Sequence, residues 1–87
     1  MITSAQMRAA RALAGIDQKT LAERAGVSLP TIQRMEASDG VVRGVIDTLV
    51  KVIQALEESG VVLVDDGRPS ESGGRGVRLK DPGRPVG

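Results

Sequence analysis

The chain has 87 residues, of which 40% are hydrophobic, and its 12 basic and 11 acidic side chains give a formal net charge of +1. The sequence contains no Cys and no His, which excludes disulfides, thiolate metal sites, imidazole catalysis and imidazole metal ligation. It also contains no Phe, Tyr or Trp, so any core is aliphatic. Because 87 residues allow only one small core, we expect the chain to associate with itself.

Segments that target proteins or build enzyme sites are missing from the sequence. The start, MITSAQMRAARALAG, has no apolar stretch of signal-peptide type, and no run approaches membrane-spanning length. There is no phosphate loop or glycine-rich nucleotide fingerprint, and the acidic residues are scattered. We therefore expect a cytoplasmic protein that is not an enzyme and has no cofactor, metal or membrane contact.

A first helix is predicted from a capping box at Thr3 and Gln6 up to Gly15. One side of this helix is expected to face the core, and its members are Gln6, Met7, Ala10, Leu13 and Ala14. Arg11 falls at the edge of this buried side, where an unpaired charge would be costly.

Residues 17–36, DQKTLAERAGVSLPTIQRME, predict two short helices joined by a tight turn. Asp17 can cap a helix over Gln18–Ala25, and Gly26 supplies the left-handed stop that commonly follows a last helical turn. A second helix then starts at Leu29. This stretch is the element around which the rest of the chain is organised.

The second of these helices has one face for the core and one for solvent. Ser28 is its expected N-cap, and Pro30 lies in the first turn, where a missing N–H costs nothing. At about 100° per residue, the buried face holds Ile32, Met35 and Glu36, whereas the outward face holds Pro30, Gln33 and Arg34, with Thr31 on the flank. Such a helix fits the helix-turn-helix arrangement that enters the major groove of DNA.

The chain resembles the Xre family, the Cro and phage-repressor type of helix-turn-helix protein. The matching residues are Gln18, Leu21, Ala22, Ala25, Gly26, Val27, Ser28, Thr31, Ile32, Met35 and Glu36. The resemblance implies a mainly α fold, a four-helix lambda-repressor-like domain. It also implies that Arg11 and Glu36 form a structural ion pair, that Gln18 contacts a backbone phosphate and can brace the recognition helix, and that Arg43 contacts the DNA backbone near the start of the fourth helix.

Base reading is assigned to the outward face of the recognition helix. Arg34 is the first candidate, because a guanidinium matches the O6 and N7 acceptors of guanine; a phosphate contact is the alternative. Gln33 can pair with adenine, and Pro30 and Leu29 can offer apolar contacts, for example to a thymine methyl group. Phosphate contacts are assigned to Gln18, Lys19, Ser28 and Thr31, in addition to Arg43.

The net charge of the chain does not indicate DNA binding, but the distribution of charge near the second helix of residues 17–36 does. Residues 1–59 hold seven basic and seven acidic residues, but residues 24–35 hold two arginines and no acid. This local excess of positive charge suits an approach to phosphates.

The C-terminal third predicts one more helix and a hairpin. A fourth helix is expected from about Val45 to Ser59, with an apolar stripe of Val45, Leu49, Val52, Ile53 and Leu56. Strands are expected at 61–64 and 76–80, with Val77 and Leu79 inward, and with a flexible connection between them. A two-stranded hairpin needs cover, which another protomer could give. The expected organisation is a helix-turn-helix domain over 1–60, a hairpin over 61–80 that could serve dimerisation, and a disordered tail over 81–87.

Together these features predict a sequence-specific transcriptional regulator that binds double-stranded DNA as a homodimer on an inverted repeat. Its two recognition helices would enter successive major grooves about 34 Å apart. Two alternatives stay open: an antitoxin or restriction-controller regulator with a protein partner, and an interaction adaptor that captures a partner strand at the hairpin edge. The fourth helix and the hairpin are both candidates for the dimer interface.

Overall fold

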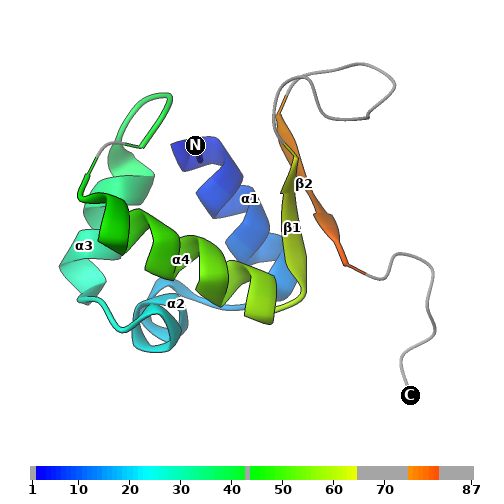
Figure 1. Cartoon of the computed structure of the whole chain (residues 1–87), viewed down its shortest axis with the longest axis horizontal. Helices are drawn as coiled ribbons and strands as arrows, with labels where there is room; N and C mark the ends of the chain where they lie inside the picture. Colours follow the sequence, from blue (N-terminus) through cyan, green and yellow to red (C-terminus); the bar gives the residue numbers. More distant parts are fainter. Residues whose placement is uncertain (1, 43, 65–74, 81–87) are drawn as a thin grey trace.

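The computed structural model describes residues 2–42, 44–64 and 75–80. These residues form four helices and one antiparallel hairpin (Figure 1), which confirms the predicted fold class. In chain order the elements are α1 (Ser4–Ala14), α2 (Gln18–Ala25), α3 (Leu29–Ala37), α4 (Ile46–Glu58), β1 (Val61–Val64) and β2 (Gly76–Leu79). The predicted tail 81–87, the connection 65–74 and Arg43 lie outside the described residues. Within the described ranges, no helix has the length and hydropathy needed to cross a membrane.

The ends of α1 follow from its local sequence. The Thr3 hydroxyl accepts a hydrogen bond from the Gln6 backbone N–H at 3.0 Å, and the Gln6 side-chain oxygen accepts one from the Thr3 N–H at 2.9 Å. This reciprocal pair satisfies two of the N–H groups that a helix start leaves without partners. Gly15 ends the helix in the left-handed conformation, with φ of 72°.

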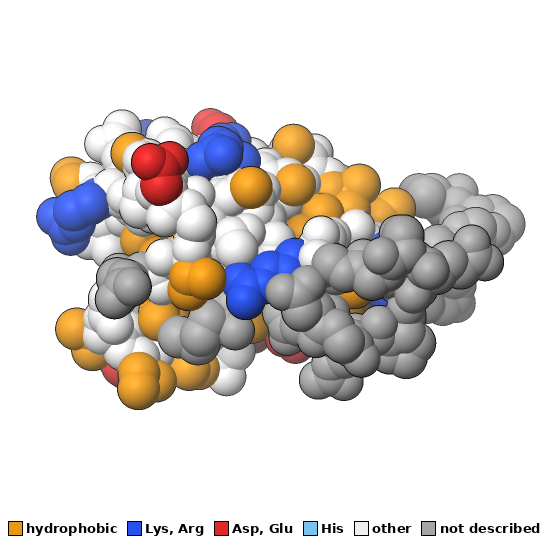
Figure 2. Space-filling model, turned by 90° about the horizontal axis from the view of Figure 1, so that it is seen from above, with side chains coloured by type: hydrophobic (Ala, Val, Ile, Leu, Met, Phe, Trp, Pro, Cys, Tyr) orange, Lys and Arg blue, Asp and Glu red, His pale blue; other side chains and the backbone are white. Residues whose placement is uncertain are grey.

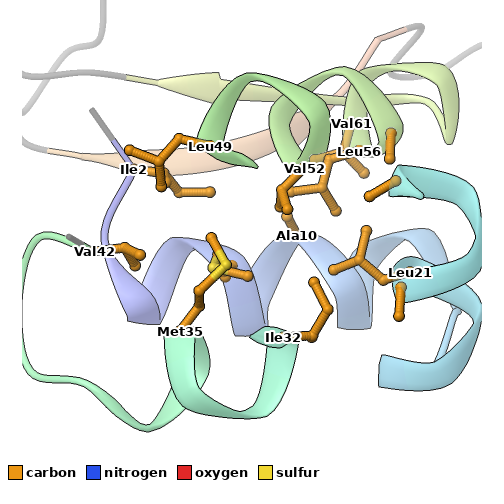
Figure 3. Close-up of a cluster of buried hydrophobic side chains, with 14 residues drawn as sticks. Ile2, Ala10, Leu21, Ile32, Met35, Val42, Leu49, Val52, Leu56 and Val61 are labelled. Carbon is orange, nitrogen blue, oxygen red and sulfur yellow. The ribbon is translucent and has the colours of Figure 1, made fainter. Parts of the chain in front are cut away.

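The core is aliphatic and lies between the helices. Figure 3 shows side chains from α1, α2, α3 and α4 pointing into one interior. Its buried members are Ile2, Met7, Ala10, Leu21, Ala22, Ala25, Ile32, Met35, Val42, Leu49, Val52, Ala55, Leu56 and Val61. Since every helix and the first strand contribute to this cluster, the hairpin is packed onto the same core as the recognition helix.

The N-terminal segment and the loop after α3 are tied together by backbone pairing. Thr3 and Val41 form an isolated antiparallel bridge, and the Val42 N–H donates to the Ile2 carbonyl at 2.9 Å. Both Ile2 and Val42 are buried as a result. The loop that precedes α4 is thus fixed at its N-terminal half by the start of the chain.

The hairpin packs its inner face on the chain's own helices. Val61 pairs with Leu79 and Val64 with Gly76, and both α1 and α4 pack against the strands. Gln6 holds the end of the hairpin, because its side-chain nitrogen donates to the carbonyls of both Val64 and Gly76 at 3.1 Å. One face therefore has cover without a second protomer.

Three apolar positions expected to be buried are exposed: Leu13, Val45 and Leu79. Leu13 and Leu79 lie at the edges of their apolar stripes, beyond the surface that neighbouring elements cover. Val45 is not inside α4 but is its N-cap, because the helix begins one residue later than expected. The periodicity of the sequence predicts which side of a helix or strand is apolar. It does not predict how much of that side the neighbouring elements cover.

Candidate nucleic-acid interface

The two helices of residues 17–36 are joined by a short turn with well-formed caps. The Asp17 carboxylate accepts from the Thr20 N–H at 2.7 Å and starts α2. Gly26 ends that helix with φ of 71°, and the Val27 N–H donates back to the Ala22 carbonyl at 3.0 Å. The Ser28 hydroxyl then accepts from the Thr31 N–H at 3.3 Å and starts α3. Each N-cap bonds to the N–H three residues after it, and only Val27 separates the Gly26 stop from the Ser28 cap, so the turn between the two helices is set locally.

The faces of α3 are divided as the periodicity indicates. Ile32, Met35 and Glu36 are buried, whereas Pro30, Gln33 and Arg34 are exposed. Leu29 is only partly accessible, because it packs against the core. The exposed face thus offers an amide, a guanidinium and a pyrrolidine ring to an outside partner, with Leu29 at its margin.

The buried carboxylate of Glu36 joins α3 to both preceding helices. Arg11 of α1 binds it through two nitrogens, Nε to Oε2 at 2.9 Å and Nη2 to Oε1 at 3.0 Å. Gln18 of α2 donates from Nε2 to Oε1 at 3.2 Å. The structure therefore contains the Arg11–Glu36 ion pair and the brace that the resemblance implied for Gln18. Because a bidentate guanidinium is geometrically specific, this network fixes the orientation of α3.

Arg8 adds a contact that sequence reasoning missed. Its Nη1 atom donates to the backbone carbonyl of Glu36 at 2.6 Å, near the C-terminal end of α3, where helix carbonyls lack partners. The available signal was the spacing of Arg8 and Arg11, which puts both arginines on one flank of α1. The recognition helix is thus held at its C-terminal end by two arginines of α1.

Two pKa values are shifted by these contacts. The hydrogen bond from the Arg11 side chain to Glu36 raises the pKa of the Arg11 guanidinium above its ordinary value. Hydrogen bonds from the backbone and side chain of Thr20 lower the pKa of the Asp17 carboxyl. Both shifts favour the charged form of the group.

The described residues assigned to phosphates lie at the starts of α2 and α3. Gln18 and Lys19 lie in the first turn of α2. The free N–H groups of a helix start can bind an anion. The hydroxyls of Ser28 and Thr31 are 2.8 Å apart at the start of α3. Lys19 and Ser28 are exposed, and Gln18 and Thr31 are partly exposed. Arg43 lies outside the described residues.

Arg24 lies away from these helix starts, in the last turn of α2. Its Nη1 atom donates to the Ser59 hydroxyl at 2.9 Å, beside the C-terminal end of α4. Of the two arginines counted in residues 24–35, only Arg34 is on the outward face of α3. Figure 2 shows acidic, basic and hydrophobic side chains interspersed on one face of the molecule. α3 itself offers one basic side chain, Arg34, in a chain whose formal net charge is +1.

The model of a helix-turn-helix family matches residues 7–63, which span most of α1, all of α2, α3 and α4, and most of β1. No curated protein matches the chain significantly.

Proposed function

The chain belongs to the helix-turn-helix family of the Xre and Cro type, and from this premise we propose that it is a sequence-specific regulator that binds an inverted-repeat operator as a dimer. Proteins of this family are DNA-binding transcriptional regulators in general. The specific operator reading, the dimer and the residue roles below are our proposal.

The observation that carries the proposal is the contrast between the two sides of α3. Its inner side is fixed by Ile32, Met35 and the Glu36 network, whereas Gln33 and Arg34 are exposed. A helix held rigidly with polar side chains outward loses little conformational freedom on entering a groove. Exposed position and rigid support together suit direct readout of base edges.

The base contacts are assigned by donor geometry. Arg34 would donate two hydrogen bonds to O6 and N7 of a guanine, and Gln33 would pair with N6 and N7 of an adenine. Pro30 has no side-chain donor, so it would give an apolar contact such as one to a thymine methyl group. Leu29 would add to that contact only through the part of its side chain that the core leaves accessible.

The phosphate contacts position the helix without reading sequence. An amide nitrogen has two N–H donors, and Gln18 gives one to Glu36; we assign the other to a phosphate. Lys19, Ser28 and Thr31 would follow the same strand of the backbone. Because few cations take part, binding to non-specific DNA should be weak. High affinity for the operator should therefore require that both half-sites are occupied.

The test is selection of binding sites from a random DNA pool, followed by titration of the preferred site at several salt concentrations. Arg34→Ala should lose about 1 to 3 kcal/mol of binding free energy and relax selectivity at one base pair, with little change in the salt slope. Lys19→Ala should weaken binding to all sequences alike and reduce the salt slope by about one.

Two results would count against these assignments. Equal weakening by Arg34→Ala on every sequence would move Arg34 from the base contacts to the phosphate contacts. Failure of the wild-type protein to enrich any site, while it remains folded, would overturn sequence-specific regulation as the function.

A further inference from the structure

We propose that Arg8 is a positioning residue for base reading, because it fixes the end of α3 that carries Arg34. The inference rests on the proposed function, in which Arg34 is the first of the base contacts. Arg8 belongs to α1, outside the helix assigned to the major groove, so its effect on DNA would pass through the position of α3.

The C-terminal end of α3 is built differently from the ends of α1 and α2. Those two helices end at Gly15 and Gly26, which are left-handed and whose N–H groups return to carbonyls of the last turn. α3 instead ends at Ser38, whose backbone is extended, with φ of −73° and ψ of 161°. An extended residue leads the chain away from the helix, so the last carbonyls of α3 need other donors.

Two side chains supply such donors. The Ser38 hydroxyl donates to the Met35 carbonyl at 2.8 Å, and Nη1 of Arg8 donates to the Glu36 carbonyl at 2.6 Å. The serine bond is local, whereas the arginine bond comes from a helix 28 residues away in the chain. A positively charged donor is also favoured at a helix C-terminus, where the carbonyls carry partial negative charge. Arg8 therefore ties the end of α3 to a separate element.

Arg34 depends on this end of the helix. It lies in the last turn of α3, two residues before the carbonyl that Arg8 binds. Fraying of that turn would move Arg34, whereas the start of α3 would stay in place through the Ser28 cap. A guanidinium discriminates guanine only when both of its hydrogen bonds are aligned, so a small displacement lowers selectivity. A phosphate contact tolerates more displacement, because it depends mainly on charge.

The contact made by Arg8 differs from that made by Arg11. Arg11 binds the buried carboxylate of Glu36, so its loss should disturb the whole domain. Arg8 binds the backbone of the same residue from an exposed position, so its loss should be confined to the last turn of α3. Arg8 can thus be replaced while the protein stays folded.

The experiment compares Arg8→Met with the wild type in the full chain. The DNA is the site selected from the random pool, and the same site changed at the base pair where Arg34→Ala relaxes selectivity. Arg8→Met should lower the preference for the selected base pair about three- to tenfold, since a misaligned guanidinium keeps only part of the discrimination of a bidentate contact. The salt slope should stay the same, because Arg8 is not assigned to a phosphate.

The matched control is Arg24→Met. Arg24 is also an exposed arginine that donates a hydrogen bond, to the Ser59 hydroxyl, and its replacement removes the same charge. It lies in the last turn of α2, so the variant should keep the wild-type preference at this base pair. An equal loss of preference in both variants would assign the effect to the charge of the protein and overturn the proposal.

A double variant tests whether Arg8 acts through Arg34. Adding Arg8→Met to Arg34→Ala should lower selectivity at this base pair no further, because the group that Arg8 positions is already absent. Additive losses would mean that Arg8 acts on DNA independently. A salt slope reduced by about one in Arg8→Met would make Arg8 a phosphate contact. Either result overturns the proposal.

Hydrogen exchange without DNA reads the helix end directly. The amides of residues 35–37 should exchange faster in Arg8→Met than in the wild type, whereas those of residues 31 and 32, which bond to Ser28, should not. Unchanged exchange over 35–37 would overturn the role of Arg8 and leave the regulator intact. A folded wild-type protein that enriches no DNA site would overturn the regulator and, with it, the role of Arg8 in base reading.

Discussion

The recognition helix and the hairpin are both anchored to α1, but by opposite kinds of chemistry. α3 is held by an ion pair between Arg11 and the buried Glu36, whereas the hairpin is held by the neutral amide of Gln6. A buried charge is costly without its partner, and a neutral group much less so. The orientation of α3, the helix assigned to DNA, is therefore fixed by the stronger of the two interactions. The Arg11–Glu36 ion pair and the Gln6 hydrogen bonds can also be removed separately by mutation.

Breaking the charged anchor should have the largest effect. Arg11→Met keeps an unbranched apolar stem but leaves the Glu36 carboxylate, which is only 4% exposed, with Gln18 as its remaining side-chain donor among the described residues. We expect a loss of about 3 to 5 kcal/mol in the free energy of unfolding, measured with urea. DNA affinity should fall as well, because α3 loses its fixed orientation.

An exposed ion pair provides the matched control for that variant. Lys51 and Asp47 are 3.2 Å apart with side chains 49% and 74% exposed, against 24% for Arg11. Lys51→Met should therefore change the free energy of unfolding by only about 0 to 1 kcal/mol. Equal losses in the two variants would show that burial does not distinguish the pairs and would remove the basis of the comparison.

Breaking the neutral anchor should have a smaller effect, confined largely to the hairpin. Gln6→Met removes the donor that serves the carbonyls of Val64 and Gly76, together with the acceptor for the Thr3 N–H. We expect a loss of about 1 to 3 kcal/mol and faster hydrogen exchange at the amides of β1 than at those of α3.

The same substitution at an exposed glutamine is the control. It distinguishes the loss of the Gln6 hydrogen bonds from the general effect of replacing Gln with Met in a helix. Gln54 lies on the exposed side of α4, so Gln54→Met should change stability by no more than about 0.5 kcal/mol. If exchange in Gln6→Met speeds up equally in α3 and β1, then the two anchors act on one cooperative unit rather than on separate elements.

In these two regions, the sequence predicts interactions between residues close together in the chain better than interactions between distant residues. The starts of α1, α2 and α3 were predictable, because Thr3, Asp17 and Ser28 each bond to a backbone N–H three residues away. The pairing of Arg11 with Glu36 was implied by family resemblance. The clamp by Gln6 was not predictable, since its partners are carbonyls 58 and 70 residues away, and backbone carbonyls have no sequence signature.

Exposure at the edges of apolar stripes was not predictable for a related reason. A period of 3.6 residues in a helix, or of 2 in a strand, gives the direction of an apolar stripe, but the width that is covered depends on how neighbouring elements are placed. Leu13 and Leu79 therefore appeared as core residues in the sequence. Val45 appeared so because the predicted helix began one residue too early, whereas Val45 is the exposed N-cap of α4.

The smallest effect on stability is expected at the N-cap of α2, where the contribution of Asp17 depends on pH. Thr20 hydrogen bonds lower the pKa of Asp17, so its carboxylate contributes stability above the unfolded value of about 3.9 and loses it as pH falls through the folded value. Asp17→Asn retains an N-cap acceptor but has no charge to titrate. The melting temperature of the wild type should therefore fall relative to that of Asp17→Asn between about pH 5 and pH 2, and be steady above it. A difference that is constant over this range would mean that the hydrogen bonds from Thr20 do not favour the ionised cap, and that the start of α2 is held by packing of Leu21 and Ala22 instead.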